Sequence, residues 1–96
     1  MYAQLTIFKT APEKREQAER MADRAHATLK NVAGFKGATY FGDPDRNEYG
    51  ALYLWENKEV LDAVMKEIMP RMVEATDFLA VGTPVRSIFE VYEPKL

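Results

Sequence analysis

The stretch from Glu48 to Ala63, EYGALYLWENKEVLDA, constrains the fold of this chain more than any other segment. Its first half is rich in aromatic and aliphatic residues that favour a strand, and it ends in Trp55, the only tryptophan. Asn57 then provides a helix N-cap, which predicts a helix that begins almost directly after the strand. The rest of the chain is therefore expected to be arranged around one junction between a strand and a helix.

The segment before this junction first predicts a strand and a helix. Tyr2–Lys9 alternates with period two, which places Gln4 on the opposite face of a strand from Leu5. The residues from Thr10 to Glu13 have the pattern of a capping box, with Pro in the first turn. An apolar stripe at helical spacing follows, so we expect a helix that runs to about residue 31.

A hairpin is predicted next. Gly34 is expected to stop the preceding helix, and Gly37–Asp43 then has the composition of a second strand. The segment from Asp43 to Asn47 is rich in turn formers. We therefore expect this strand to pair with Glu48–Trp55.

The segment after the junction predicts a helix and a last strand. Pro70 is expected to bend or end the helix, because proline cannot donate a backbone hydrogen bond to the preceding turn. We expect a short helical continuation to about Ala75, a connecting loop, and a final strand over Val85–Tyr92. Arg86 and Glu90 share one face of that strand, which favours an ion pair between them.

This order of elements, βαββαβ, predicts an α+β ferredoxin-like fold: a four-stranded antiparallel sheet with two helices on one face. The length of 96 residues allows one domain, residues 1–96. The strands carry apolar side chains on both faces, although two helices cover only one face. An uncovered apolar face is unusual in a monomer, so we expect a two-fold homodimer that packs sheet on sheet.

Composition excludes several classes of function. The formal net charge is −2, with acids and bases interleaved, which argues against a basic nucleic-acid-binding face. The chain has no cysteine and one histidine, so it offers no cluster of cysteine or histidine ligands for a metal site. The N-terminal segment has neither a basic region nor a long apolar run, which predicts a cytoplasmic protein without a membrane segment.

Three sequence features carry a resemblance to a known family. They are the run from Ala33 to Thr39 (AGFKGAT), the junction from Leu54 to Glu59 (LWENKE) and the closing strand from Phe89 to Tyr92 (FEVY). Together with the βαββαβ order, they resemble the antibiotic biosynthesis monooxygenase family of the dimeric α+β barrel superfamily. The resemblance covers nearly the whole chain, and the tryptophan before a polar helix start is its most diagnostic part.

The resemblance implies a dimer with a ligand cavity between the sheet and the helices. The family includes cofactor-independent oxygenases that act on polycyclic anthrones and quinols, haem-degrading enzymes and many proteins of unknown role. The haem-degrading members ligate iron through a histidine on the second helix, and Lys58–Met69 contains none. This departure weighs against haem degradation and leaves chemistry without a cofactor.

Two site residues are implied by position within the family. Trp55 matches the strand-three tryptophan, which would form a cavity wall that stacks on a flat aromatic substrate. The same residue is equally consistent with an anchor of the core. Gln4 lies near a strand-one amide, usually Asn, that lines the haem pocket of the haem-degrading members. It would act as a hydrogen-bond donor in the site, or instead satisfy backbone groups near the sheet edge.

The remaining candidates come from the chemistry of the side chains. His26, the only histidine, flanks the apolar stripe of the first helix and is the best-placed general base if it reaches a cavity. Tyr40 and Tyr53 lie on the central hairpin, where tyrosines commonly serve packing. If they share a cavity with Trp55, their hydroxyl groups would orient a phenolic substrate.

The leading hypothesis from the sequence is therefore a cofactor-independent monooxygenase for a small aromatic or quinol-type substrate. The alternatives are a non-catalytic dimer that binds a small apolar ligand or has a structural role, a haem-binding protein, and an isomerase-like enzyme on the same scaffold. No second unmistakable catalytic residue separates the first hypothesis from the second.

Overall fold

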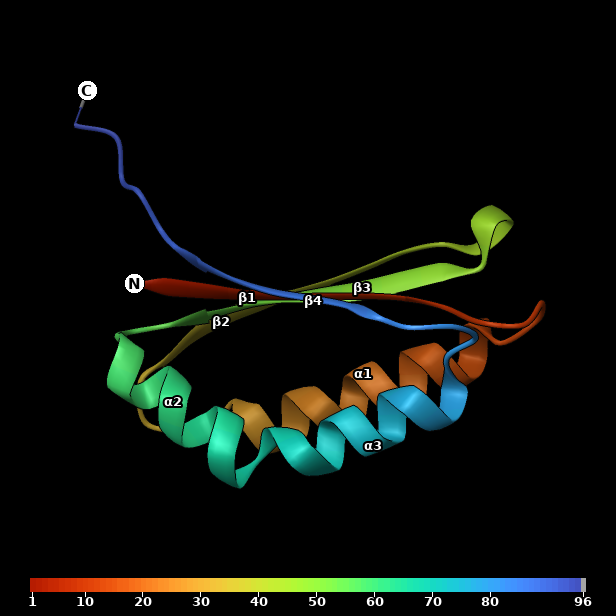
Figure 1. Ribbon diagram of the computed structural model, residues 1–96, viewed down its shortest axis with the longest axis horizontal. Coiled ribbons are helices and arrows are strands. Elements are labelled where there is room, and N and C mark those ends of the chain that lie inside the picture. The colour runs from red at the N-terminus through yellow and green to blue at the C-terminus, as the bar shows by residue number, and fades with distance from the viewer. Residues whose placement is uncertain (96) are drawn as a thin grey trace.

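The computed structural model describes residues 1–95 and shows one antiparallel sheet with a layer of helices on one face (Figure 1). The strands lie in the order β2-β3-β1-β4. They are β1 (Tyr2–Lys9), β2 (Phe35–Asp43), β3 (Glu48–Trp55) and β4 (Val85–Glu90). The helices are α1 (Arg15–Leu29), α2 (Lys58–Glu67) and α3 (Met69–Leu79). The ferredoxin-like fold predicted from the sequence is confirmed.

Strand β3 lies at the centre of the sheet and pairs along its whole length with β1 on one side and β2 on the other. The register places Gln4 opposite Tyr53, and Tyr2 opposite Trp55. Because side chains alternate along a strand, these four residues share the face that the helices cover. Leu5 lies opposite Leu52 and belongs to the other face. The register thus settles which face carries Trp55.

The first helix begins later than the capping box predicted. Thr10 does not cap it: its hydroxyl group donates to the carbonyl oxygen of Ala11, and its backbone N–H donates to Asn47 at the end of the hairpin. Glu13 has a left-handed backbone with φ of 65°, so a turn separates Thr10 from the helix. The helix therefore starts at Arg15, without a side-chain cap. Thr10 is buried and hydrogen-bonded to the hairpin, so it packs with the sheet instead of capping the helix.

The second helical segment is longer than predicted and is broken. Pro70 lies in the first turn of α3, the position that tolerates a residue without a backbone N–H. Ile68 separates α3 from α2. The helical layer therefore contains three helices instead of two. Helix α3 continues to Leu79, so the expected connecting loop begins later than predicted. Strand β4 ends at Glu90, and beyond it the chain leaves the sheet on the uncovered side (Figure 1).

The junction after β3 is held by two local features. The side-chain oxygen of Asn57 accepts a hydrogen bond of 2.9 Å from the backbone N–H of Val60, which confirms the predicted N-cap. The carbonyl oxygen of Gly34 accepts a hydrogen bond of 2.8 Å from the N–H of Glu56. Gly34 does not end α1 directly. Its φ of 90° instead turns the chain into β2, close against Val60.

The core lies between the sheet and the helices. Its main cluster contains fully buried side chains from α1, β3 and α2, namely Leu29, Trp55, Leu61 and Val64. A smaller cluster lies toward the other end of the sheet, around Phe8, Ala18 and Tyr49. Across residues 1–95, none of the helices combines the length and hydrophobicity that a membrane crossing requires.

Gly34 and Gly82 provide a matched pair of substitutions. Both have positive φ, but a Cβ at Gly34 would lie 2.7 Å from Cγ2 of Val60, whereas a Cβ at Gly82 would meet nothing within 4 Å. Gly82→Ala should cost about 1 kcal/mol in free energy of unfolding from backbone strain alone. Gly34→Ala should cost about 1–3 kcal/mol more, because it also overpacks the junction.

Urea denaturation of the two variants measures this difference. Adding Val60→Ala to Gly34→Ala should remove the extra cost, since the clashing methyl groups are gone. Equal destabilisation by the two glycine substitutions would show that the contact with Val60 does not constrain the junction.

Candidate functional site

A cavity of about 540 Å³ lies between the covered face of the sheet and helices α1 and α3. Its wall is mainly apolar and aromatic, with Phe8, Tyr40, Tyr49, Tyr53, Met21, Met65, Met69 and Met72 among the lining residues. Five charged side chains also line it: Arg15, Glu19, Arg24, Arg71 and Arg86. A concave apolar cavity of this size with a few polar groups is typical of a small-molecule site.

Gln4 is the buried polar side chain of the cavity wall. Its Oε1 accepts a hydrogen bond of 3.2 Å from Nε1 of Trp55, and its Nε2 donates to Sδ of Met65 at 3.2 Å. The indole nitrogen is only a donor, so the amide oxygen must face Trp55 and the amide nitrogen must face the cavity side. The orientation of the Gln4 amide is therefore fixed by Trp55.

Trp55 itself has no exposed surface and belongs to the core cluster. Its ring contacts Phe35 edge to face, with ring centroids 5.5 Å apart, and Tyr53 at 6.5 Å. It reaches the cavity through Gln4, whose side chain lies in the wall in front of it. In this structure the tryptophan serves as an anchor of the core and as the hydrogen-bond donor to Gln4.

Tyr40 and Tyr53 both line the cavity and contact each other edge to face, with ring centroids 5.7 Å apart. Tyr40 lies opposite Ala51 across the β2–β3 pair, so it is a diagonal neighbour of Tyr53 on the same face. Burial raises the pKa of Tyr53 well above its usual value, and its contact with Tyr40 raises it further. Burial also raises the pKa of Tyr40. Both hydroxyl groups are therefore neutral at physiological pH.

His26 lies on the exposed side of α1 and contacts the cavity wall from outside. Its ring packs edge to face against Phe35 and Tyr40, with centroids 5.9 and 5.7 Å away. Its Nδ1 lies 3.4 Å from the hydroxyl oxygen of Tyr40. The structure thus brings Gln4, Tyr40 and Tyr53 together at the cavity, with Trp55 behind the wall and His26 at its outer surface.

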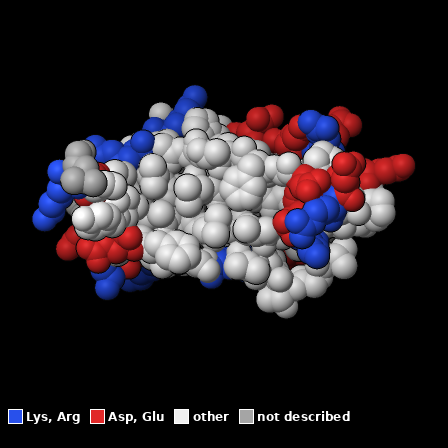
Figure 2. Space-filling model, turned by 90° about the horizontal axis from the view of Figure 1, so that it is seen from above, with Lys and Arg blue, Asp and Glu red and all other residues white. Residues whose placement is uncertain are grey.

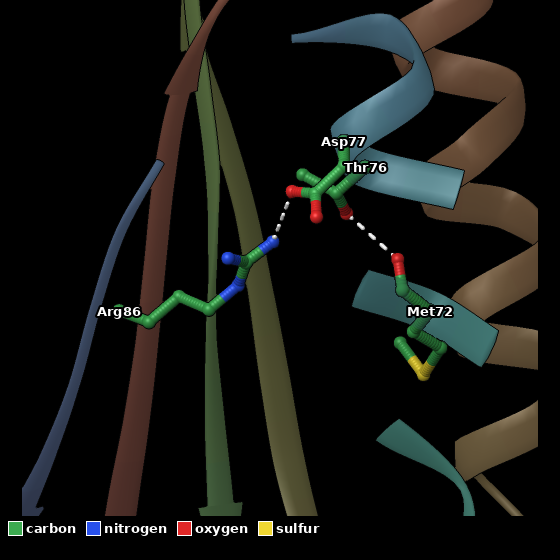
Figure 3. Close-up of polar contacts among 4 residues, drawn as sticks. All are labelled: Met72, Thr76, Asp77 and Arg86. Atoms are coloured by element: carbon green, nitrogen blue, oxygen red, sulfur yellow. Dashed lines mark hydrogen bonds and ion pairs between the residues drawn. The ribbon is translucent and has the colours of Figure 1, made fainter. Parts of the chain in front are cut away.

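Arg86 is a cavity residue that the sequence did not reveal as part of a site. Its guanidinium group binds Oδ1 of Asp77, from α3, at 3.0 Å across the space between the sheet and the helix (Figure 3). The expected pair with Glu90 is wrong. Four residues along a strand span about 13 Å, which separates the two groups, whereas Asp77 lies directly opposite. Only the true length of α3, which continues past Thr76, would have predicted this contact.

The comparisons with known proteins rest on structure. No protein-family model matches the sequence, and no curated protein does either. SnoaB, a cofactor-independent oxygenase from Streptomyces nogalater, aligns with 16% identity over 98% of this chain and 95% of that chain, with a TM-score of 0.79. A monooxygenase from the gene ActVA-Orf6 of Streptomyces coelicolor, in complex with nanaomycin D, aligns with 16% identity over 99% and 90%, with a TM-score of 0.75.

The chain has the fold of the antibiotic biosynthesis monooxygenases. The resemblance seen in the sequence is thereby confirmed for the fold. A dimeric ferredoxin-like protein of unknown function from Jannaschia sp. CCS1 shares this fold, with 15% identity over 94% of this chain and 98% of that chain and a TM-score of 0.77. At these identities, the likeness to oxygenases and to a protein of unknown function establishes neither the reaction nor the ligand.

Proposed function

We propose that this protein is a cofactor-independent oxygenase whose substrate is a flat aromatic compound with an acidic proton, such as an anthrone or a quinol. The observation that carries this proposal is the Gln4 amide, which is buried in the wall of an apolar cavity and oriented by Trp55. Both ends of this amide are hydrogen-bonded, but the partner of its Nε2 is the thioether sulfur of Met65, a weak acceptor that an oxygen atom of a ligand would replace.

The Gln4 amide is suited to stabilise negative charge on a bound substrate. Among the described residues, one of its two N–H hydrogens has a partner, Sδ of Met65. The other is available to an oxygen atom of a ligand in the cavity. A preorganised donor in an apolar cavity stabilises a developing oxyanion more strongly than water does, because it needs no reorganisation.

The proposed reaction needs no cofactor because the substrate supplies the electrons. For an anthrone, loss of a proton from the methylene carbon gives an enolate, which passes one electron to O₂. The resulting radicals combine to a hydroperoxide, and loss of water leaves the quinone. The balance is one anthrone and one O₂ to one quinone and one water. The protein binds and orients the substrate, stabilises the enolate oxygen and accepts the proton.

The remaining candidates receive roles that fit their positions. Tyr40 and Tyr53 would contact the substrate through their rings and hydroxyl groups, since both line the cavity. Trp55 would hold Gln4 and support the aromatic wall from behind. His26 would accept the proton from outside the cavity, through Tyr40.

Oxygen uptake with 1,8-dihydroxyanthrone and with a naphthoquinol tests the proposal. The Gln4→Leu variant removes the amide at similar volume and should lower kcat for oxygen uptake about 10²–10³-fold, the effect typical of losing one oxyanion donor. Gln17→Leu is the matched control, since Gln17 lies on α1 and does not line the cavity. It should leave kcat unchanged.

Circular dichroism at the assay temperature checks that both variants are folded, because Gln4→Leu also leaves the indole N–H of Trp55 without its partner. Saturable binding without oxygen uptake by the unaltered protein would support a non-catalytic binding protein instead. Unchanged kcat in Gln4→Leu would rule out the proposed role of the amide.

We also infer that the chain forms a homodimer through the uncovered face of its sheet. Figure 2 shows that face, with the charged side chains gathered toward its two ends and a broad uncharged area between them. The exposed apolar side chains of this face include Phe41, Val85 and Phe89, which are 43%, 55% and 52% exposed. An apolar area of this kind on a sheet favours packing against a second copy of the same face.

Two phenylalanines allow a matched test of this interface. Phe89→Asp places a charge on the uncovered face, whereas Phe78→Asp makes the same change on α3, where Phe78 is 95% exposed. Sedimentation equilibrium should give twice the chain mass of 11.0 kDa for the unaltered protein and for Phe78→Asp. Phe89→Asp should give a monomer, because a charge would be buried without a partner. A monomeric unaltered protein would refute the dimer.

A further inference from the structure

Three side chains lead from the cavity to the surface of the molecule. Tyr53, almost fully buried, lines the cavity, and its ring packs edge to face against that of Tyr40, with centroids 5.7 Å apart. The Tyr40 hydroxyl in turn lies 3.4 Å from Nδ1 of His26, whose ring is exposed to solvent on α1. The Tyr40 ring packs edge to face against both Tyr53 and His26, which keeps the three side chains next to one another.

The chemistry of these groups suits the movement of a proton in one direction. A tyrosine hydroxyl can accept one hydrogen bond while it donates another, and a neutral imidazole nitrogen can accept. Burial raises the pKa of Tyr53, so this residue cannot serve as a phenolate base at neutral pH. It can still receive a proton if it releases its own at the same time. His26 is the only group of the three whose type gains a proton readily near pH 7.

We propose that Tyr53, Tyr40 and His26 form a relay that carries the substrate's proton from the cavity to the surface. In one step, the substrate O–H or C–H proton passes to the Tyr53 oxygen, the Tyr53 proton to the Tyr40 oxygen, and the Tyr40 proton to Nδ1 of His26. The substrate becomes an anion, the histidine becomes a cation, and both tyrosines end as neutral phenols. This relay rests on the proposed function and names its substrates as phenols, enols and acidic carbon acids.

Glu19 is the acidic residue among those that line the cavity. Its carboxylate forms an ion pair with Arg15 at 3.2 Å. The charged group that acts on Tyr40 is Asp23, on the same helix as His26, and its negative charge favours the arrival of a proton nearby.

Proton transfer on binding can be measured without turnover. The probe is 1,8-dihydroxyanthraquinone, which is yellow as the neutral phenol in water at pH 7.5, turns red when a phenol group ionises, and has no methylene carbon to oxidise. The Cε1–H signal in the proton NMR spectrum reports the charge of His26 without ambiguity, because the chain has one histidine. At pH 7.5, binding should ionise the dye and shift this signal toward its protonated position in equal proportion.

Tyr40→Phe keeps the aromatic ring and removes the hydroxyl group that lies next to Nδ1 of His26. In this variant the dye should still bind, but the histidine signal should not move with its ionisation. Tyr92→Phe is the matched control, since Tyr92 is 76% exposed and is not among the residues that line the cavity. It should behave as the unaltered protein. A histidine signal that stays fixed in the unaltered protein while the dye ionises would overturn the relay.

Turnover gives a second readout for the same proposal. With 1,8-dihydroxyanthrone, Tyr40→Phe and His26→Ala should each lower kcat at least tenfold. The double variant should be no slower than either single variant, because each substitution alone already interrupts the relay. Imidazole in the buffer should restore kcat of the His26→Ala variant, since the side chain of His26 is exposed and free imidazole can take its place. It should not restore kcat of Tyr40→Phe. Effects that multiply in the double variant, or a loss only in Glu19→Gln, would contradict the relay.

The two proposals fail in different ways. If 1,8-dihydroxyanthraquinone does not bind and no oxygen is consumed, the oxygenase function fails and the relay fails with it. If the protein consumes oxygen but neither tyrosine nor histidine substitution alters kcat, the relay alone is refuted.

Discussion

The hydrogen bond from Nε1 of Trp55 to Oε1 of Gln4 is the interaction on which the rest of the site depends. It joins a fully buried side chain of the core to the buried polar group of the cavity wall. Because indole can only donate, this single bond determines which end of the amide is left for a ligand. The β1–β3 register makes it possible, since it places the two residues on one face and two positions apart across neighbouring strands. Stability and function therefore share one residue, Trp55.

The same sheet has a second face that a chain of this size cannot cover. Three helices occupy one side, and the other side carries aliphatic and aromatic side chains in contact with solvent in a single copy. A small domain buries a limited fraction of its surface, so a second copy adds burial that the chain lacks. In the proposed dimer the two faces would have separate tasks: one encloses the cavity and the other would pack against the second copy.

Local pattern in the sequence was enough to predict the strands, the hairpin, the Asn57 cap and the break at Pro70, because each depends on neighbours in the chain. The start of α1 was missed because Thr10 is held by Asn47, a contact between distant segments. The site was only partly predictable. Gln4 and the two tyrosines could be selected as candidates from the sequence. That all three line the same cavity depends on the strand register, which the sequence pattern did not give. The ion pair of Arg86 with Asp77 depends on where α3 ends, which its sequence did not indicate.

The central claim is that the cavity beside Gln4 binds a flat aromatic molecule within reach of Trp55. Because Trp55 is the only tryptophan, its fluorescence can be titrated with 1,8-dihydroxyanthrone under anaerobic conditions, with N-acetyltryptophanamide as the control for inner-filter effects. The account predicts saturable quenching of the protein beyond that control, since a bound ring would lie one residue away from the indole. Emission that stays unchanged, or that falls only as the control does, would contradict it.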